Sequence, residues 1–136
     1  MTIHTHASGP YLRVEAIDVL TQEDLPALFK AFEAAHRAGP FVVLTDTMQM
    51  KSAPRAVIAA FADGLKKIAP GSKNWVGDAV VVKSAAVRFV LSTLLVVAPM
   101  PTEVKAFDNP QEARRWCAWL LHRERITLPP ELLRTA

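Results

Sequence analysis

An acid and two hydroxyl side chains follow a strongly apolar run in the middle of the sequence. Asp46, Thr47 and Ser52 come after the segment FVVL, and a helical pattern begins behind them. A carboxylate at the carboxyl end of a parallel strand stands where α/β folds place ligands, and a phosphate at a helix N-terminus is stabilised by the helix dipole. The structural alternatives are that Asp46 bonds amides of its own loop and that Ser52 caps the next helix. We predict a phosphoacceptor or loop binding site at Asp46, Thr47 and Ser52, and keep these alternatives open.

The other reactive side chains predict neither catalysis nor a metal centre. Cys117 lies between Trp116 and Ala118 inside a predicted helix, which favours an inert thiol over a nucleophile. His4 and His6 face one side of a predicted strand, but two imidazoles are too few for a stable metal site. The sequence has no nucleophile elbow, no glycine-rich phosphate loop and no H-E-x-x-H motif. We therefore expect a protein that is not an enzyme, with no catalytic residues, no metal and no cofactor.

Composition narrows the class of protein further. The chain has 136 residues, of which 51% are hydrophobic and 21% charged, as in an ordinary folded domain. Its single cysteine fits a reducing compartment, and neither a signal peptide nor an apolar run of about 20 residues is evident. The net charge of +3 comes from basic residues scattered among acids, unlike a nucleic-acid-binding surface. We expect a cytoplasmic protein without membrane insertion or a nucleic-acid partner.

Strand and helix patterns alternate along the chain. Two short alternating segments, Thr2–Thr5 and Tyr11–Glu15, flank a turn cluster and predict a hairpin. Further strands are expected at Phe41–Asp46, Asp78–Lys83 and Thr102–Phe107, and helices are expected after N-caps at Thr21, Ser52, Ser84 and Asn109. Because such alternation requires crossover connections, the predicted class is α/β with a mostly parallel central sheet. Residues 1–136 form one domain with an N-terminal hairpin, about four helices and a C-terminal tail at 127–136.

The third predicted helix is apolar around its whole circumference. Between Ala85 and Ala98 the only charged residue is Arg88. A helix of this kind is buried on more than one side, so the face away from the sheet needs a second cover. Three covers are open: another subunit or protein, a hydrophobic ligand, or the C-terminal tail through Leu128, Leu132 and Leu133. We predict an interface formed by Arg88, Phe89, Thr93, Leu95 and Val96.

Four segments of the chain together resemble a known family. The segments VLTQEDLPAL, FVVLTD, VGDAVVVKSAAVRFVL and VKAFDNPQEARRWCAWL are similar to the bacterial STAS-like (SpoIIAA-like) proteins. The closing match comprises Phe107, Asp108, Glu112, Ala113, Trp119 and Leu120. The resemblance covers about Leu12 to Leu121 and implies a small α/β sandwich without catalysis that binds a regulatory protein. Many relatives form dimers, and some are similar to the CRAL-TRIO lipid-transfer fold.

The chain departs from this family at its regulatory motif. In the anti-sigma-factor antagonists, the phosphorylated serine follows an aspartate in an Asp-Ser-Ser/Thr-Gly pattern. The segment from Asp46 to Ser52 lacks both the glycine and the double hydroxyl. We therefore predict a non-catalytic STAS-like interaction and regulatory module that forms a homodimer through its third helix and binds an unidentified regulatory protein. The alternative is a carrier or sensor of a hydrophobic small molecule, such as a lipid, in a CRAL-TRIO-like pocket.

Overall fold

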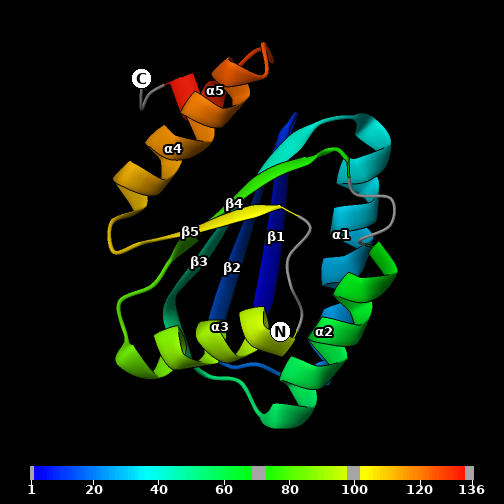
Figure 1. The fold of residues 1–136 in the computed structure, drawn as a ribbon, viewed down its shortest axis with the longest axis vertical. Coiled ribbons are helices and arrows are strands. Elements are labelled where there is room, and N and C mark those ends of the chain that lie inside the picture. The colour runs from blue at the N-terminus through cyan, green and yellow to red at the C-terminus, as the bar shows by residue number, and fades with distance from the viewer. Residues whose placement is uncertain (1, 69–72, 98–101, 134–136) are drawn as a thin grey trace.

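The chain folds around one mixed sheet with helices on both of its faces (Figure 1). The structure is a computed structural model that describes residues 2–68, 73–97 and 102–133. Within these residues, five strands lie in the order β1-β2-β3-β4-β5. β1 (Ile3–Ser8) and β2 (Tyr11–Val19) form an antiparallel hairpin, and β3 (Phe41–Ser52), β4 (Trp75–Val81) and β5 (Glu103–Phe107) are added in parallel. The predicted α/β class, mostly parallel sheet and N-terminal hairpin are confirmed.

The direction of the crossovers decides which helices cover which face. Three helices each connect neighbouring parallel strands: α1 (Leu25–Ala38), α2 (Arg55–Ile68) and α3 (Ala85–Val97). Each of these connections leads to the next strand in the same direction across the sheet. Because such crossovers are right-handed, the three helices lie on one face. α4 (Pro110–Arg123) packs on β3 and β4 from the other face and is followed by α5 (Pro130–Leu133). Figure 1 shows α4 and α5 well apart from the other three helices.

The face under α4 is closely packed. Tyr11, Val42 and Val81 of the sheet meet Cys117 and Leu120 of α4, and all five are buried. Gly77 permits this approach, because a Cβ atom there would lie 2.4 Å from Leu120 Cδ1. The side chains of the C-terminal tail that join the same cluster are Ile126, Leu128 and Leu132. The tail therefore covers the α4 face, and the alternative that it covers the third helix is wrong.

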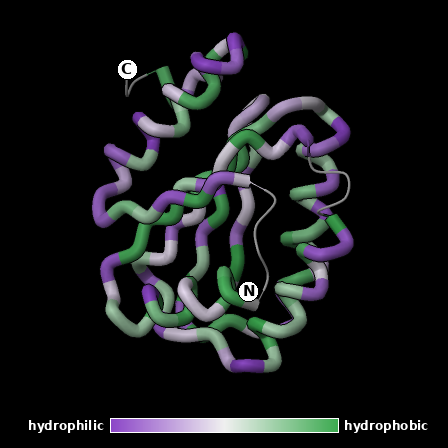
Figure 2. Tube along the Cα trace, viewed as in Figure 1, coloured by the Kyte–Doolittle hydropathy of each residue, from purple (hydrophilic) through white to green (hydrophobic). Residues whose placement is uncertain are grey.

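The face under α1, α2 and α3 carries two separate clusters. Under α1, the Phe32 and Phe41 rings contact Trp75 at centroid distances of 5.0 and 6.2 Å. Under α3, Val80 of β4 and Val82, which follows that strand, pack against Val87. Figure 2 shows hydrophobic segments running through the strands and along the inner sides of these helices.

The first helix begins later than predicted. Thr21 makes no N-cap bond, and a single 3-10 turn, Gln22–Asp24, precedes α1. The Thr21 hydroxyl donates instead to the carboxylate of Asp24 at 2.7 Å, and that carboxylate also accepts bonds from the backbone and the hydroxyl of Thr2. Because Asp24 bonds the start of β1, the acid joins the hairpin to α1 instead of completing a capping box.

The third strand is longer than predicted, and this moves the predicted polar loop into the sheet. β3 continues past Asp46 to Ser52, since β2 also extends to Val19 and pairs with it through two register shifts. The Ser52 carbonyl accepts a bond from the Leu20 amide at 3.1 Å. Ser52 is therefore not the N-cap of α2. The Pro54 carbonyl opens that helix by accepting bonds from the amides of Val57 and Ile58, both at 3.0 Å.

The two later N-caps are confirmed. The Ser84 hydroxyl accepts a bond from the Val87 amide at 3.3 Å, and the Asn109 side chain accepts bonds from Gln111 and Glu112. The sequence also predicts that Pro99 and Pro101 end the third helix, and these two residues lie outside the described residues. β4 starts at Trp75, ahead of the predicted Asp78, and this earlier start places Asp78 well inside the strand.

Candidate functional site

A cavity of about 130 Å³ lies between the sheet and the helices α1, α2 and α3. Its inner walls come from strand residues such as Val14, Val80 and Val104, and its outer walls from α2 and α3. Half-buried side chains at the outer wall are Ile58, Phe61, Leu94 and Leu95. For comparison, an engineered apolar cavity of about 150 Å³ binds benzene. The cavity therefore has room for a six-membered ring or a short alkyl chain.

One carboxyl group lies on the floor of this cavity. Asp78 is 6% exposed, and its Oδ1 accepts a bond of 2.9 Å from the Thr45 hydroxyl. Within the described ranges, no cationic side chain lines the cavity and no second hydrogen bond reaches this carboxyl. Burial raises the pKa of Asp78 to about 7, although the bond from Thr45 opposes the shift. Near neutral pH the charged and neutral forms of this carboxyl are therefore both populated.

The strand register explains why these polar residues face the cavity. Successive side chains of a strand point to opposite faces, so Thr45 and Thr47 of β3 share a side. Asp78 pairs with Val43 and therefore lies next to Thr45 on that side. Asp78 was not predicted from the sequence as a site residue. The available signal was a single acid within the apolar run VGDAVVV, where a carboxyl in a central strand has no route to solvent.

The structure does not bring together Asp46, Thr47 and Ser52. Thr47 is 8% exposed and donates its hydroxyl to the Val81 carbonyl at 2.6 Å, so this hydroxyl is occupied inside the fold. Asp46 faces the other way and accepts a bond from the Met48 amide at 2.9 Å, as the structural alternative predicted. Ser52 is exposed at the end of β3. Phosphorylation of Ser52 remains a prediction, whereas a site combining all three side chains has no geometric basis.

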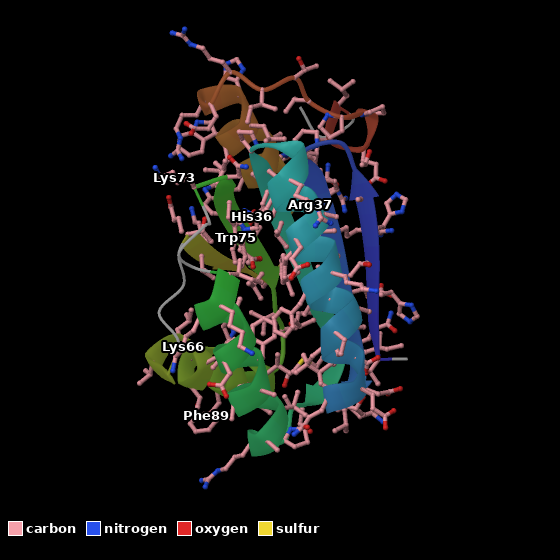
Figure 3. The ribbon with its side chains drawn as sticks, turned by 90° about the vertical axis from the view of Figure 1, so that its right-hand side faces the viewer. His36, Arg37, Lys66, Lys73, Trp75 and Phe89 are labelled. Carbon is pink, nitrogen blue, oxygen red and sulfur yellow. The ribbon has the colours of Figure 1, made fainter. Side chains whose placement is uncertain are left out.

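The α3 helix has two different faces. Phe89 and Val96 are 73% and 82% exposed, and a spacing of seven residues places both on one side of the helix. Figure 3 shows Phe89 at the edge of the molecule beside α3. Leu95 lines the cavity on the inner side. The predicted interface residues are therefore divided between an outer surface and the cavity wall.

The two polar members of the predicted interface bond backbone carbonyls. Arg88 is exposed, and its guanidinium donates to the Val82 carbonyl at 3.3 Å. The Thr93 hydroxyl donates to the Phe89 carbonyl at 2.9 Å within the helix. Both side chains are thus held against the fold, beside the exposed Phe89 and Val96.

The remaining reactive side chains lie apart from the cavity. Cys117 is buried under α4, its thiol is 3.8 Å from the Val43 carbonyl, and burial raises the pKa of this thiol. His6 Nε2 lies 2.8 Å from a carboxylate oxygen of Glu131, while His4 is exposed on β1. Over residues 2–68, 73–97 and 102–133, no three His, Cys, Asp or Glu side chains are grouped as metal ligands.

A second set of unpaired polar atoms lies beside α1. The rings of His36 and Trp75 both contact Phe41, at centroid distances of 5.1 and 6.2 Å (Figure 3). Both ring nitrogens of His36 and Nε1 of Trp75 are buried without hydrogen-bond partners. Burial lowers the pKa of His36, which favours a neutral imidazole. Since aromatic rings pack around them, these atoms do not form a site open to a ligand.

The comparisons with known proteins agree with this architecture. The family model described as SpoIIAA-like matches residues 11–118. The chain belongs to the SpoIIAA-like family. Among the curated proteins, none matches it. Over the part of the chain that the structure describes, no helix has the length and hydropathy needed to cross a bilayer.

Two solved structures share the SpoIIAA-like fold with this chain. One is a protein from Shewanella loihica PV-4 described as having a SpoIIAA-like fold, with 21% identity and a TM-score of 0.59, covering 85% of this chain and 91% of the other. The second is an anti-sigma factor antagonist from Mycobacterium paratuberculosis, with 14% identity and a TM-score of 0.52, covering 86% of this chain and 93% of the other. At these identities the likeness concerns the fold, which includes the sheet and the helices around the cavity.

Proposed function

We propose that this SpoIIAA-like protein is a non-catalytic regulatory module that binds another protein chain through the outer surface of α3. The observation that carries the proposal is the exposure of Phe89 and Val96 on one side of that helix. Large apolar side chains that stay in water are costly, and when grouped they are typical of interaction sites. The Mycobacterium paratuberculosis relative in fold, described as an anti-sigma factor antagonist, is consistent with a regulatory role.

A second copy of the chain is the partner that we propose for this surface. In a two-fold symmetric contact the same patch meets itself, so charges on the patch lie near equal charges. The α3 segment contains a single charged residue, Arg88, which leaves such a contact with little repulsion. Pairing Phe89 and Val96 with their symmetry equivalents buries both side chains without introducing an unpaired acid.

Light scattering after size exclusion tests the homodimer. The wild type is expected at about twice 14.9 kDa at two concentrations tenfold apart, and Val96→Glu at the monomer mass with an unchanged circular dichroism spectrum. Val96 is the better choice than Leu95, because Leu95 lines the cavity and a charge there would disturb the fold. Leu133→Glu is the matched control: Leu133 is also exposed but lies on α5, and this variant should remain dimeric. A folded Val96→Glu dimer would exclude the α3 surface.

A second candidate function is the binding of a hydrophobic small molecule, as a carrier or sensor. The cavity of about 130 Å³ favours it, because its walls are almost entirely apolar and its outer wall is formed by half-buried side chains of α2 and α3. Protein extracted under denaturing conditions should then release an apolar compound that mass spectrometry detects. Clean extracts from several expression hosts would count against this function.

A further inference from the structure

The floor of the cavity carries a carboxyl group, whereas its walls are apolar, and this difference indicates the kind of ligand that fits. On the basis of the second function proposed above, we propose that the cavity binds a hydrophobic amine. Its ammonium group pairs with the Asp78 carboxylate, and its apolar part lies against the residues of α2 and α3.

The Asp78 carboxyl is isolated on the floor of the cavity. It is the single charged group lining the cavity among the described residues, and its only hydrogen bond comes from Thr45. A buried carboxylate without a counter-charge is strongly destabilising, whereas the same group paired with a cation forms a short, strong hydrogen bond. An ammonium group on the ligand supplies the counter-charge that is missing among the described residues of the cavity.

The floor of the cavity supplies hydrogen-bond acceptors. A primary ammonium group carries three donors and no acceptor. The floor offers the carboxylate of Asp78 and the hydroxyl oxygen of Thr45, which donates its proton to that carboxylate and keeps lone pairs. A ligand carboxylate meets a like charge in the same place, so fatty acids are excluded. A neutral alcohol forms one weaker bond.

Cavity size sets the length of the apolar part. A space of about 130 Å³ is close to the engineered cavity that binds benzene. A chain of roughly six carbons therefore fills it. A longer chain would extend outward past Phe61 and Leu94, which form part of the outer wall.

The test compares three probes with the same six-carbon chain: hexylamine, hexanol and hexanoate. Binding is followed by amide shifts in NMR titrations at about pH 8, on the wild type, Asp78→Asn and the control Asp63→Asn. We expect hexylamine to bind the wild type at least about tenfold more tightly than hexanol, the difference between a charge-assisted and a neutral bond. Asp78→Asn should abolish this preference. Asp63 is exposed on α2, so Asp63→Asn should keep it.

A pH series on the unmodified protein tests the same pairing without a substitution. Among the described residues, the groups around Asp78 are Thr45, the apolar cavity walls and, in the core of the other face, the Cys117 thiol, so neither a histidine nor a second carboxyl lines the cavity there. Because burial raises the pKa of Asp78 to about 7, hexylamine must displace a proton at lower pH. Its affinity should weaken by roughly tenfold for each pH unit below 7, whereas that of hexanol should change little.

The outcomes distinguish the binding of any apolar molecule in the cavity from the selection of an amine by Asp78. If none of the three probes binds, the second candidate function fails together with the amine. If hexanol and hexylamine bind equally to the wild type and to Asp78→Asn, the cavity binds apolar molecules but Asp78 does not select among them. Hexylamine affinity that stays constant between pH 5 and pH 8 would also overturn the pairing.

Discussion

The two faces of the sheet are built from similar residues but are filled differently. Under α4, Leu120, Leu121 and Cys117 are completely buried against the sheet, and the C-terminal tail closes the rim. Under α1, α2 and α3, three helices leave a cavity of about 130 Å³ and enclose Asp78. Protein interiors are normally packed with few voids larger than a water molecule. The comparison therefore indicates that the α4 face provides stability, whereas the other face is not closely packed around the cavity.

The connectivity explains this division. α4 does not connect two strands of the described sheet: it follows β5 and leads to α5. α1, α2 and α3 each follow one parallel strand and precede the next. In Figure 1, α3 crosses the lower end of the sheet beside α2. The cavity lies where these three helices meet the sheet. The same α3 helix has its exposed apolar surface on the outside and the cavity on the inside.

The largest expected effect is a loss of stability on the closed face. Leu120→Ala removes a completely buried side chain that meets the sheet beside Gly77, and should lower the free energy of unfolding by about 3 to 5 kcal/mol. Leu94→Ala removes the same atoms from the half-buried cavity wall, where the surroundings are already loose, and should cost about 1 kcal/mol or less. Urea denaturation measures both. Equal losses would mean that the two faces are packed alike.

The next effect is the pH dependence that Asp78 adds. Since its pKa is about 7 in the native state and about 3.9 in an unfolded chain, the native state keeps a proton that the unfolded chain has released between these values. The free energy of unfolding should therefore fall as pH rises from about 4 to 7, by about 1.4 kcal/mol for each unit, and stay level above 7. Asp78→Asn should remove this fall.

Two other groups must be separated from Asp78 in that experiment. Burial lowers the pKa of His36, so this residue contributes with the opposite sign: its stabilisation is present above the unfolded value of about 6.5 and is lost as pH falls. The Asp24 pKa is raised by burial but lowered more strongly by bonds from Thr2 and Thr21, so Asp24 titrates below this window. The difference in the free energy of unfolding between wild type and Asp78→Asn, taken at each pH, cancels the contributions of His36 and Asp24. Parallel stability profiles would contradict the burial of an isolated carboxyl.

The smallest effect comes from a matched pair of buried alanines. Ala79 and Ala16 both lie in strands, but Ala79 faces α4 whereas Ala16 lines the cavity. Ala79→Val adds two methyl groups to a filled core and should destabilise by about 1 to 3 kcal/mol. Ala16→Val adds them to empty space and should be neutral or stabilising by up to about 1 kcal/mol. Thermal unfolding followed by circular dichroism resolves the two, and destabilisation by both would mean that the cavity closes in solution.

Several elements were predictable because their signals are local. The Asn109 side chain caps α4 as expected, since an Asn followed by Pro and a first-turn acid satisfies the free amides of a helix start. The Ser84 cap and the apolar run of β3 were also predictable, because each is a local signal in the sequence. The exposure of Phe89 and Val96 agrees with the inference that an all-apolar helix has more apolar surface than one sheet face can cover.

The errors concern partners that are distant in the sequence. Ser52 has the composition of an N-cap, but pairing with Val19 draws it into β3. Asp24 lies three residues after Thr21, the spacing of a capping box, yet it bonds Thr2, 22 residues away. Asp78 was missed because its position inside β4 depends on an early strand start at Trp75, which is fixed by pairing with Phe41. Local propensity does not contain such pairings.

The sequence alone therefore determined the class of the fold, its mostly parallel sheet, the later helix starts and the excess of apolar surface on α3. These follow from periodicity and capping, which act over a few residues. The tertiary structure decided that the tail covers α4 instead of α3, that Asp46, Thr47 and Ser52 diverge, and that Thr45 and Asp78 meet on the floor of a cavity. Handedness of the crossovers and strand register produced these results, because they bring together residues that no local pattern connects.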